Sequence, residues 1–520
     1  MLARHRLEWG TAVLASVLGA AYLLLPPMGS DLSAQVARAD FFAAHGYTPI
    51  DLRWYAGVDQ LGYSLLSQPI MALIGVRVTG VLALIAATVL LAVLFRRTAA
   101  PRPWLGALAG VACIAGNLVS GRVTYGLGVA FGLGALTVLT FPRWRWLAIV
   151  PALAASATSP VAGLFLGLAG AALLLAGRVL DGLLVAVPAA VPLALTALLF
   201  GDGGWMNISH QDTLRAVVAS LVVAVLVPHR AVRIGALLSA LGVLGAALVH
   251  TPVGLNATRL SAMFTLPLLA AYAAVPRFRR GVPLGVHEKG GPLEPPLWVV
   301  LILVAAACWW QPPVVTGDVR DIGNPTASPS YFAPLLSRLG QETLTGRVEI
   351  PPTRDYWESA HMGDVQLARG WLRQADLDRN PLFFHEIPGT SGTGVSLTAA
   401  SYQAWLTDVA VQFVAVPDAE LTWSGRPEAA LIAAGLPYLT KIWQGDHWTL
   451  YRFSDSTPIV ADITGQNATS VTFTTESAGN VVVRVRYYRW LKASGGAVVS
   501  RTGPWTLVRV PEPGRYTLTS

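Results

Sequence analysis

The sequence predicts a polytopic α-helical membrane protein of roughly eleven transmembrane helices with a C-terminal extracytoplasmic α/β plus β-sandwich domain. Two observations lead to this fold class. The 520 residues are 53% hydrophobic and only 13% charged, whereas a soluble globular protein carries about a quarter charged residues. Charged residues are also sparse up to about Trp310 and return at ordinary density from Asp318 onward. This change in composition marks the main domain boundary.

Three domains follow from the same pattern. We expect a transmembrane domain over 1–313, which includes an external loop at 28–68, and an α/β domain over 314–455. The last part, 456–520, contains segments such as SVTFTTES and WTLVRV, which alternate at period two between Gly and Pro turns. It is therefore predicted to be a small antiparallel β-sandwich.

The predicted spans are apolar runs close to the roughly 20 residues that a helix needs to cross the hydrocarbon core. They lie near 9–27, 70–95, 104–120, 122–141, 146–158, 160–177, 182–200, 214–228, 234–250, 258–275 and 297–312. The first run follows two arginines, as a signal peptide does. No small-residue cleavage site follows it, so it is predicted to be a retained helix.

The positions of Lys and Arg predict the orientation in the plasma membrane. Alternate connections carry clusters of basic residues, and we assign these connections to the cytoplasm. The clusters contain Arg4, Arg6, Arg96, Arg97, Arg102, Arg143, Arg145, Arg178, Arg230, Arg233, Arg277, Arg279, Arg280 and Lys289. The opposite connections carry only single arginines, so the N-terminus is predicted to be cytoplasmic and the C-terminal domain extracytoplasmic.

The distribution of the basic residues and the positions of the two cysteines exclude other classes of protein. The formal charge of +8 comes from short clusters between apolar runs rather than from one basic face, so no nucleic-acid partner is expected. Cys113 and Cys308 both lie within apolar runs. They predict neither a disulfide framework nor a cysteine metal site.

The first external connection, 28–68, is too long for a turn and is rich in acidic residues. Its segment SDLSAQVARADFFAAHG is predicted to be a helix whose apolar side lies along the membrane surface. That apolar side comprises Leu32, Val36, Phe42 and Ala43. Asp31 stands at the exit of the first span, where partial desolvation makes a carboxylate a stronger general base. A plain N-cap role for Asp31 is an equal alternative, and Asp51 and Asp59 are predicted to be solvated.

Further polar residues gather in the other external connections. Arg259 stands at the start of an apolar helix, where an arginine either binds an anion such as phosphate or extends to the lipid headgroups. Ser159 and Pro160 interrupt an apolar hairpin, as either a tight turn or the border of a cavity. The remaining external polar residues are Arg122, His210, Asp212 and His250.

Several segments resemble the GT-C superfamily of membrane glycosyltransferases, which use polyprenyl-phosphate sugars as donors. The similar segments of the helical part are GSDLSAQVARADFF, DLRWYAGVDQLGYSLLSQP, SPVAGLFL and GLNATRLSAMFTLPLLA. Those of the C-terminal part are GRVEIPPTRDYWES, LARGWLRQADLDRNPLFF, SYQAWLTDVAVQFVAVP and GDHWTLYRF. Similar segments occur in actinobacterial GT-C-like proteins, and the chain resembles their arabinofuranosyltransferase-like branch.

The resemblance implies inverting transfer of a sugar to a cell-envelope glycan or lipid-linked acceptor, with membrane lipids as surroundings. Asp31 is then the base and Asp40 the second choice, while Arg259, Asn256 and Arg122 hold the donor phosphate. The substrate-lining residues implied are His45, Trp54, Tyr55, His210 and His250. A lipid monophosphate leaves little charge to neutralise, so no metal site or cofactor is required and a divalent cation is optional.

Two other functions stay open from the sequence. A transporter or flippase would favour internal repeats and charged residues near the middle of the membrane. A noncatalytic scaffold that keeps the GT-C fold is the other alternative, because the two adjacent carboxylates found in many GT-C enzymes are absent here.

Overall fold

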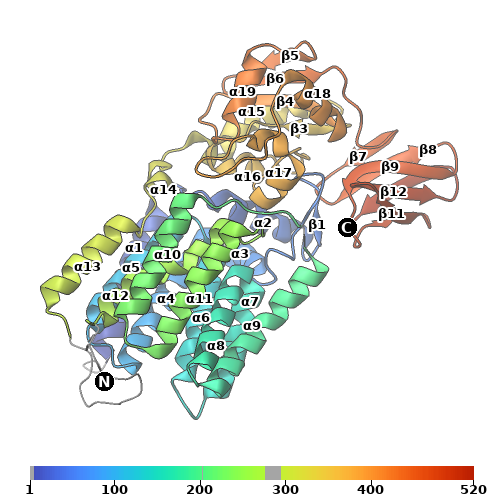
Figure 1. The fold of residues 1–520 in the computed structure, drawn as a ribbon. Coiled ribbons are helices and arrows are strands. Elements are labelled where there is room, and N and C mark those ends of the chain that lie inside the picture. Colours follow the sequence, from blue (N-terminus) through green and yellow to red (C-terminus); the bar gives the residue numbers. More distant parts are fainter. Residues whose placement is uncertain (1–4, 202, 276–293) are drawn as a thin grey trace. The chain divides into compact units, whose positions relative to one another are not determined.

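The computed structural model describes residues 5–201, 203–275 and 294–520 (Figure 1). The chain forms two compact units. The first, here called the helical unit, comprises 1–26, 64–198 and 206–320, and the second, the mixed unit, comprises 27–63, 199–205 and 321–520. The basic residues Arg4, Arg277, Arg279, Arg280 and Lys289, predicted to be cytoplasmic, lie outside the described residues.

The helical unit is built of helices that run side by side (Figure 1). They are α1 (Arg6–Leu24), α3 (Ser67–Ile74), α4 (Val76–Arg97), α5 (Pro103–Val119), α6 (Val123–Leu139), α7 (Ile149–Thr158), α8 (Pro160–Leu175), α9 (Val179–Leu199), α10 (His210–Leu226), α11 (Arg230–Leu248), α12 (Arg259–Tyr272), α13 (Leu297–Trp310) and α14 (Thr316–Arg320), with short 3₁₀ turns at η2 (Arg145–Ala148) and η3 (Gly254–Thr258).

Each of the eleven predicted spans contains a helix. Among the described residues, four helices are long and apolar enough to cross a membrane by length and composition, namely α1, α4, α9 and α11. Shorter apolar helices occupy 103–119, 123–139, 145–158, 160–175 and 297–310. The apolar helices support a membrane protein, while the number of crossings and their orientation stay predictions.

Two helix boundaries explain the irregular spans. The predicted span 70–95 is two helices, because Gly75 at φ 88° adopts a conformation that residues with a Cβ rarely accept and separates α3 from α4. Pro160 begins α8, where its fixed φ fits the first helical position. The Ser159 side chain caps this helix by accepting from the backbone N–H of Ala162. The interruption at 159–160 is thus a tight helix junction.

Small residues allow the helices of this unit to pack closely. A Cβ on Gly128 of α6 would lie 2.7 Å from the Cβ of Ala162 on α8, and one on Gly106 of α5 would lie 2.6 Å from that of Ala271 on α12. Close approach through small residues is the usual basis of helix association in membranes, where lipid tails are as apolar as leucine.

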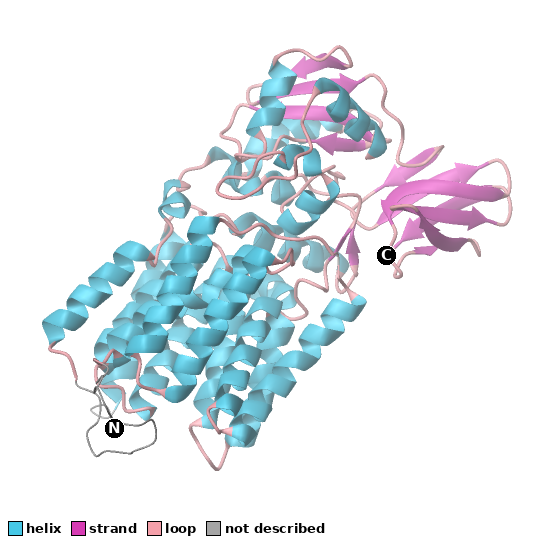
Figure 2. Cartoon of the chain, in the orientation of Figure 1, coloured by secondary structure: helices cyan, strands magenta, loops and turns pink. Residues whose placement is uncertain are grey.

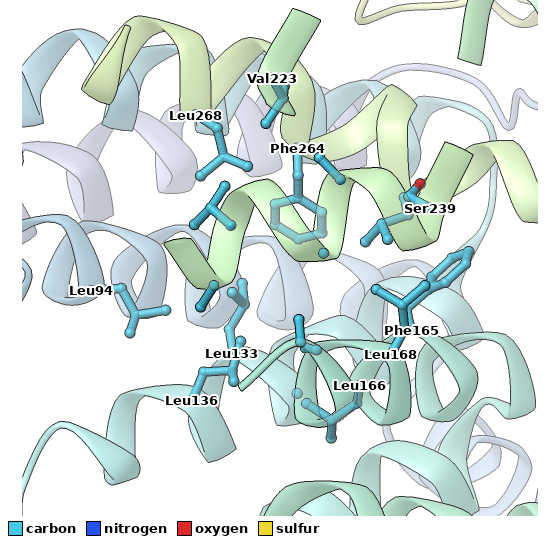
Figure 3. Close-up of a pocket in the computed structure, with 18 of the residues that line it drawn as sticks. Leu94, Leu133, Leu136, Phe165, Leu166, Leu168, Val223, Ser239, Phe264 and Leu268 are labelled. Atoms are coloured by element: carbon cyan, nitrogen blue, oxygen red, sulfur yellow. The ribbon is translucent and has the colours of Figure 1, made fainter. Parts of the chain in front are cut away.

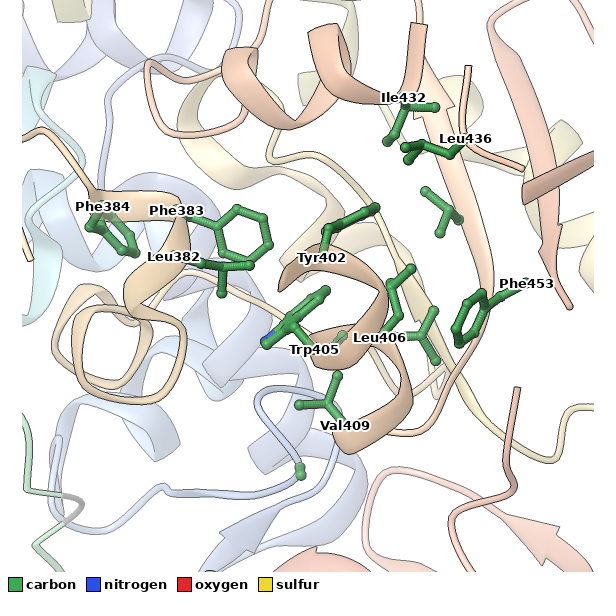
Figure 4. Close-up of a cluster of buried hydrophobic side chains, with 14 of the residues drawn as sticks. Leu382, Phe383, Phe384, Tyr402, Trp405, Leu406, Val409, Ile432, Leu436 and Phe453 are labelled. Atoms are coloured by element: carbon green, nitrogen blue, oxygen red, sulfur yellow. The ribbon is translucent and has the colours of Figure 1, made fainter. Parts of the chain in front are cut away.

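The mixed unit contains an α/β part. Its sheet has the order β3-β4-β6-β5, with β3 and β4 parallel and the other pairs antiparallel. The strands are β3 (Arg347–Glu349), β4 (Val411–Pro417), β5 (Leu439–Gln444) and β6 (Trp448–Phe453). The helices are α15 (Pro329–Leu339), α16 (Glu358–His361), α17 (Arg373–Arg379), α18 (Ala399–Asp408) and α19 (Arg426–Ala433), with 3₁₀ turns η4 (Pro325–Ala327), η5 (Arg354–Tyr356) and η6 (Pro381–Phe384). Side chains from α18, α19 and η6 form its apolar core (Figure 4).

The last part of the mixed unit consists of two antiparallel sheets, drawn as the magenta strands near the C-terminus (Figure 2). Their orders are β10-β13-β8-β7 and β11-β12-β9. The strands are β7 (Ile463–Gln466), β8 (Ser470–Thr475), β9 (Gly479–Arg486), β10 (Lys492–Ala493), β11 (Val498–Thr502), β12 (Trp505–Val510) and β13 (Gly514–Thr519). Alternate residues of both sheets, such as Phe473 and Val483, fill the space between them.

The segment 27–63 belongs to the mixed unit. It forms α2 (Leu32–His45), which ends at Gly46 with φ 61°, and then the short pair β1 (Ile50–Asp51) and β2 (Val58–Asp59). Ile50 and Leu52 are part of the apolar core between the two C-terminal sheets. The segment is therefore a structural element of this unit rather than a free loop.

Two expectations for this segment are wrong. Asp51 and Asp59, predicted to be solvated, are buried; Asp51 is held by Arg53 and Gln60, whose side chains both donate to its carboxylate. The buried residues of α2 also differ from the predicted apolar side, because Ala43 is exposed while Gln35 is buried. Residues outside the helix supply hydrogen bonds for its polar side chains: Gln35 donates to the Tyr63 hydroxyl at 2.7 Å.

A buried charge cluster joins the elements of the α/β part. The Arg369 guanidinium donates twice to Asp376, at 3.1 and 3.0 Å, and once to Glu428 at 3.0 Å, while Glu349 lies 3.8 Å away. Tyr402 donates to the other oxygen of Glu428. One cation thus faces three carboxyl groups. Burial and the adjacent Glu428 carboxylate raise the pKa of Glu349 well above its usual value of about 4.5, so Glu349 keeps its proton.

Replacing Glu349 with Gln is expected to raise the free energy of unfolding, relative to the wild type, more at pH 8 than at pH 5. Above pH 4.5 the unfolded state loses the Glu349 proton while the folded state keeps it, so the free energy of unfolding falls as pH rises toward the raised pKa. Glutamine stays neutral at both pH values, so the variant does not show this fall in the free energy of unfolding. Thermal unfolding of the full chain at both pH values measures the difference.

The matched control is Glu342→Gln, which removes a carboxylate that is paired with Arg338 and Arg452. This control should give no gain at pH 8. Equal shifts in melting temperature for Glu349→Gln at pH 5 and pH 8 would contradict a proton held at Glu349.

Candidate functional site

Two arginines predicted to bind phosphate meet at one tyrosine of the helical unit. Arg259 begins α12, and its guanidinium carbon lies 5.4 Å from the centre of the Tyr125 ring, within the range of a cation–π interaction. Arg122 immediately precedes α6, three residues before Tyr125 in the sequence. Both guanidinium groups act electrostatically on the Tyr125 hydroxyl. The structure therefore brings Arg122 and Arg259 together.

Tyr125 also lines an apolar cavity of about 340 Å³. Side chains of α4, α6, α8, α10, α11 and α12 form its wall, and Leu133, Phe165 and Phe264 are among those turned toward the common space (Figure 3). Along α12 the wall extends from Leu260 to Tyr272, which at 1.5 Å per residue is about 18 Å. Among the described lining residues none is Asp, Glu, Lys or Arg. The cavity suits an elongated apolar group.

Asn256 lies one turn before Arg259, in η3. Its side chain is buried, and its Nδ2 donates to Sδ of Met206 at 3.3 Å. This contact holds η3 against the segment that precedes α10. The predicted contact of Asn256 with a donor phosphate stays a prediction.

Asp31 stands at the N-cap position of α2 in the mixed unit, and its side chain makes no capping hydrogen bond. It is 9% exposed, and the Ser30 hydroxyl lies 3.4 Å from its Oδ1. The surrounding backbone is fixed by other parts of the unit, since Trp371 donates to the carbonyl of Ser30 at 3.1 Å. A capping hydrogen bond therefore does not account for the carboxylate at this position.

A pair of carboxyl groups, those of Asp321 and Asp355, lies near the turn that precedes α2. Asp321 accepts from the backbone N–H of Gly29 at 3.3 Å, two residues before Asp31. Burial raises the pKa of Asp321, and its hydrogen bond with the Asp355 side chain acts in the opposite direction. Two carboxyl groups from distant chain positions thus lie within hydrogen-bonding distance of each other. Spacing along the sequence gave no signal for either.

The other candidate residues of the mixed unit differ in access. Asp40 is exposed on α2, and the His45 ring packs on Phe41 with centroids 4.9 Å apart. Trp54 and Tyr55 are buried, and both side chains donate to backbone carbonyls, Trp54 to Ser359 at 3.3 Å and Tyr55 to that of Gly370. Their hydrogen bonds hold the segment 27–63 on the α/β part.

In the helical unit His210 begins α10, and both His210 and His250 are exposed. The substrate-lining role of these histidines, and of His45, Trp54 and Tyr55, stays a prediction. Asp31 and Arg259 belong to different compact units, so their joint role in one reaction is likewise a prediction.

Three further polar residues of the α/β part, Glu358, Arg369 and Arg373, make contacts within the fold. Arg369 and Glu358 are both buried, and Glu358 accepts from the Thr353 side chain. Burial raises the pKa of Glu358 to about 7. Arg373 lies 5.0 Å from the Trp423 ring centre and donates to the Tyr356 hydroxyl at 2.8 Å. Arg369 and Glu358 therefore serve the fold of the α/β part.

Tyr125 was not among the predicted site residues. The segment GRVTYGLG carries the signal that identifies it, an aromatic hydroxyl three residues after Arg122 at the start of an otherwise apolar helix. Such a residue can offer a hydrogen-bond donor to a ligand near the start of the helix.

No protein-family model and no curated protein match the chain. Among solved structures, arabinofuranosyltransferase AftD from mycobacteria aligns with 15% identity and a TM-score of 0.48, covering 91% of this chain and 41% of that chain. A mutant form of the same enzyme aligns with 13% identity and a TM-score of 0.49, covering 99% of this chain and 60% of that one. The chain thus spans less than two thirds of those proteins.

Replacing Arg53 with Met is expected to open the β1–β2 segment locally. Arg53 and Asp51 form a buried ion pair at 2.8 Å, and removing one partner of such a pair typically costs about 3–5 kcal/mol. Hydrogen exchange of the backbone amides at 50–59 in the full chain should accelerate by roughly 100-fold or more.

Arg426→Met is the matched control, because its pair with Glu420 is largely exposed and its loss costs less than about 1 kcal/mol. Unchanged exchange at 50–59 in the Arg53 variant would show that the ion pair does not hold this segment.

Proposed function

We propose that this chain is a membrane glycosyltransferase that transfers a sugar, with inversion, from a polyprenyl-phosphate donor to an extracytoplasmic glycan or lipid-linked acceptor. One observation carries the proposal. Arg122 and Arg259 meet at Tyr125, which lines a cavity of about 340 Å³ whose described lining is almost entirely apolar. A polyprenyl-phosphate sugar has the same two parts, an anionic head and a long apolar chain.

The arginines have a chemical task in this reaction. Sugar transfer breaks the bond between the anomeric carbon and the phosphate oxygen, and negative charge grows on that oxygen as the lipid phosphate leaves. A planar guanidinium donates two parallel hydrogen bonds to phosphate oxygens, and its effect is larger in apolar surroundings than in water. Donors placed where charge develops are a major source of rate acceleration. Arg259 and Arg122 supply them here.

The base is assigned to Asp31. An acceptor hydroxyl attacks the anomeric carbon on the face opposite the phosphate, which inverts that centre, and Asp31 takes the hydroxyl proton. Asp31 lies at the start of α2 and is 9% exposed. Asp40 is the second choice, and it is exposed. A divalent cation is not required by this scheme.

The cavity favours an enzyme over a transporter of polar substrates. A path for a polar substrate needs charged or hydrogen-bonding groups along its length. The described lining of this cavity instead consists mainly of leucine, valine, alanine and phenylalanine, with a few hydroxyl groups and His229. Such a lining binds a hydrocarbon chain.

Binding of undecaprenyl phosphate to the full chain in nanodiscs tests the donor class. Arg259→Gln and Arg122→Gln are each expected to weaken this binding by about tenfold or more, because each removes charge-assisted hydrogen bonds to the phosphate. Binding of undecaprenol, which lacks the phosphate, should not change in either variant.

Arg215→Gln is the matched control, since it lies in α10 of the same unit. If wild-type protein binds the phosphate and the alcohol equally, or if the Arg259 and Arg122 variants keep full preference for the phosphate, the donor assignment is wrong.

Asp31→Asn is expected to reduce sugar transfer by about 100-fold or more, which is the usual contribution of a general base. Membranes that contain the full chain would be supplied with labelled undecaprenyl-phosphate arabinofuranose or mannose, and the label entering envelope glycan measured. Undecaprenyl phosphate binding should be unchanged.

Asp446→Asn, an exposed position between β5 and β6, serves as the control in the same unit. Full activity of Asp31→Asn, with loss of activity in Asp40→Asn, would move the base to Asp40. Full activity of both would exclude a base on α2.

A further inference from the structure

The Tyr125 hydroxyl is a buried polar group without a partner. Tyr125 is 3% exposed, and its hydroxyl makes no hydrogen bond with any described residue. A buried hydroxyl that lacks a partner costs free energy, and such groups are rare in folded proteins. The cost is larger in an apolar membrane unit, where bulk water is excluded. A ligand with an acceptor atom would satisfy this hydroxyl.

A second tyrosine on the same cavity wall provides the contrast. Tyr272 stands at the other end of α12, and its hydroxyl is 2.5 Å from the Thr98 hydroxyl, with His229 packed on its ring. The nearby cation, Arg102, donates to the carbonyls of Ala270 and Ala273. At that end the protein itself satisfies the tyrosine, whereas at the Tyr125 end it does not.

The neighbours of Tyr125 determine what kind of ligand fits. Its hydroxyl can donate one hydrogen bond, and the closest charged groups, Arg122 and Arg259, are guanidinium groups that can only donate. A ligand that satisfies the Tyr125 hydroxyl beside these two cations is therefore an acceptor that carries negative charge. The Tyr125 ring lines the cavity and packs edge-on against Phe165 at 6.2 Å, so the ring contacts apolar space while its hydroxyl lies at the polar end.

We propose that the Tyr125 hydroxyl donates a hydrogen bond to a phosphate oxygen of the lipid donor and thereby fixes the head between Arg122 and Arg259. This inference rests on the proposed function and names a third binding residue for the same site. Tyr125 is a positioning residue: it sets where the first part of the lipid chain enters the cavity relative to the phosphate. The predicted preference is for lipids whose head is anionic.

Tyr125→Phe tests the hydroxyl alone, because phenylalanine keeps the ring that contacts Phe165 and Arg259. Undecaprenyl phosphate should bind about tenfold or more weakly to this variant in nanodiscs, as expected for a lost hydrogen bond to a charged group. Undecaprenol should bind as it does to the wild type. Unchanged alcohol binding and melting temperature show that the fold and the cavity are intact.

Tyr272→Phe is the matched control, since it removes a hydroxyl from the same cavity wall at the end where Thr98 already satisfies it. It should leave the ratio of phosphate to alcohol binding unchanged. Equal weakening of phosphate and alcohol by Tyr125→Phe, or no weakening of either, overturns the inference.

The outcomes separate this inference from the proposed function. In one outcome, wild-type protein prefers the phosphate over the alcohol, Arg259→Gln abolishes this preference, and Tyr125→Phe keeps it. That outcome supports the proposed donor class and contradicts the proposed role of Tyr125. Should wild-type protein show no preference, the donor class itself is wrong and the role of Tyr125 falls with it.

Discussion

The absence of water inside a bilayer is the constraint on which the helical unit depends. Backbone groups satisfy one another within helices, and small residues such as Gly106 and Gly128 allow those helices to pack without polar contacts. A buried polar side chain then needs a partner from the protein or from a ligand. The Tyr272 hydroxyl forms a hydrogen bond with the Thr98 hydroxyl. The Tyr125 hydroxyl has no hydrogen-bond partner among the described residues, although the Arg122 and Arg259 guanidinium groups act on it electrostatically. We therefore place the proposed phosphate site at the Tyr125 end of the cavity.

The mixed unit follows the same physical rule in a different form. Several of its buried charges are paired within the unit, as Arg53 is with Asp51 and Arg369 with Asp376 and Glu428. These pairs fix the segment 27–63 and the α/β core, so their residues serve the fold. Asp31 stands at a helix start whose backbone is held by Trp371. It is the carboxylate that the proposed reaction uses as its base.

Apolar runs and period-two alternation predicted the helices and the C-terminal strands, because burial in lipid and in a sandwich each impose their own pattern. The break at Gly75 and the burial of Asp51 were not predictable in this way. The first depends on one backbone conformation, and the second on partners that come from nearby turns of the folded segment. Arg259 was identified from its position at the start of an apolar helix, and Arg122 from its place in an external connection. The approach of Arg259, at the start of α12, to Tyr125 of α6 depends on the tertiary fold, which no local pattern records.

A density map of the full chain in nanodiscs with undecaprenyl phosphate bound tests the central claim most directly. The account predicts phosphate density within hydrogen-bonding distance of Arg122, Arg259 and the Tyr125 hydroxyl, with the lipid chain continuing into the cavity along α12. Phosphate density at the Tyr272 end of the cavity, or a lipid chain outside it with no density beside Tyr125, would contradict the account.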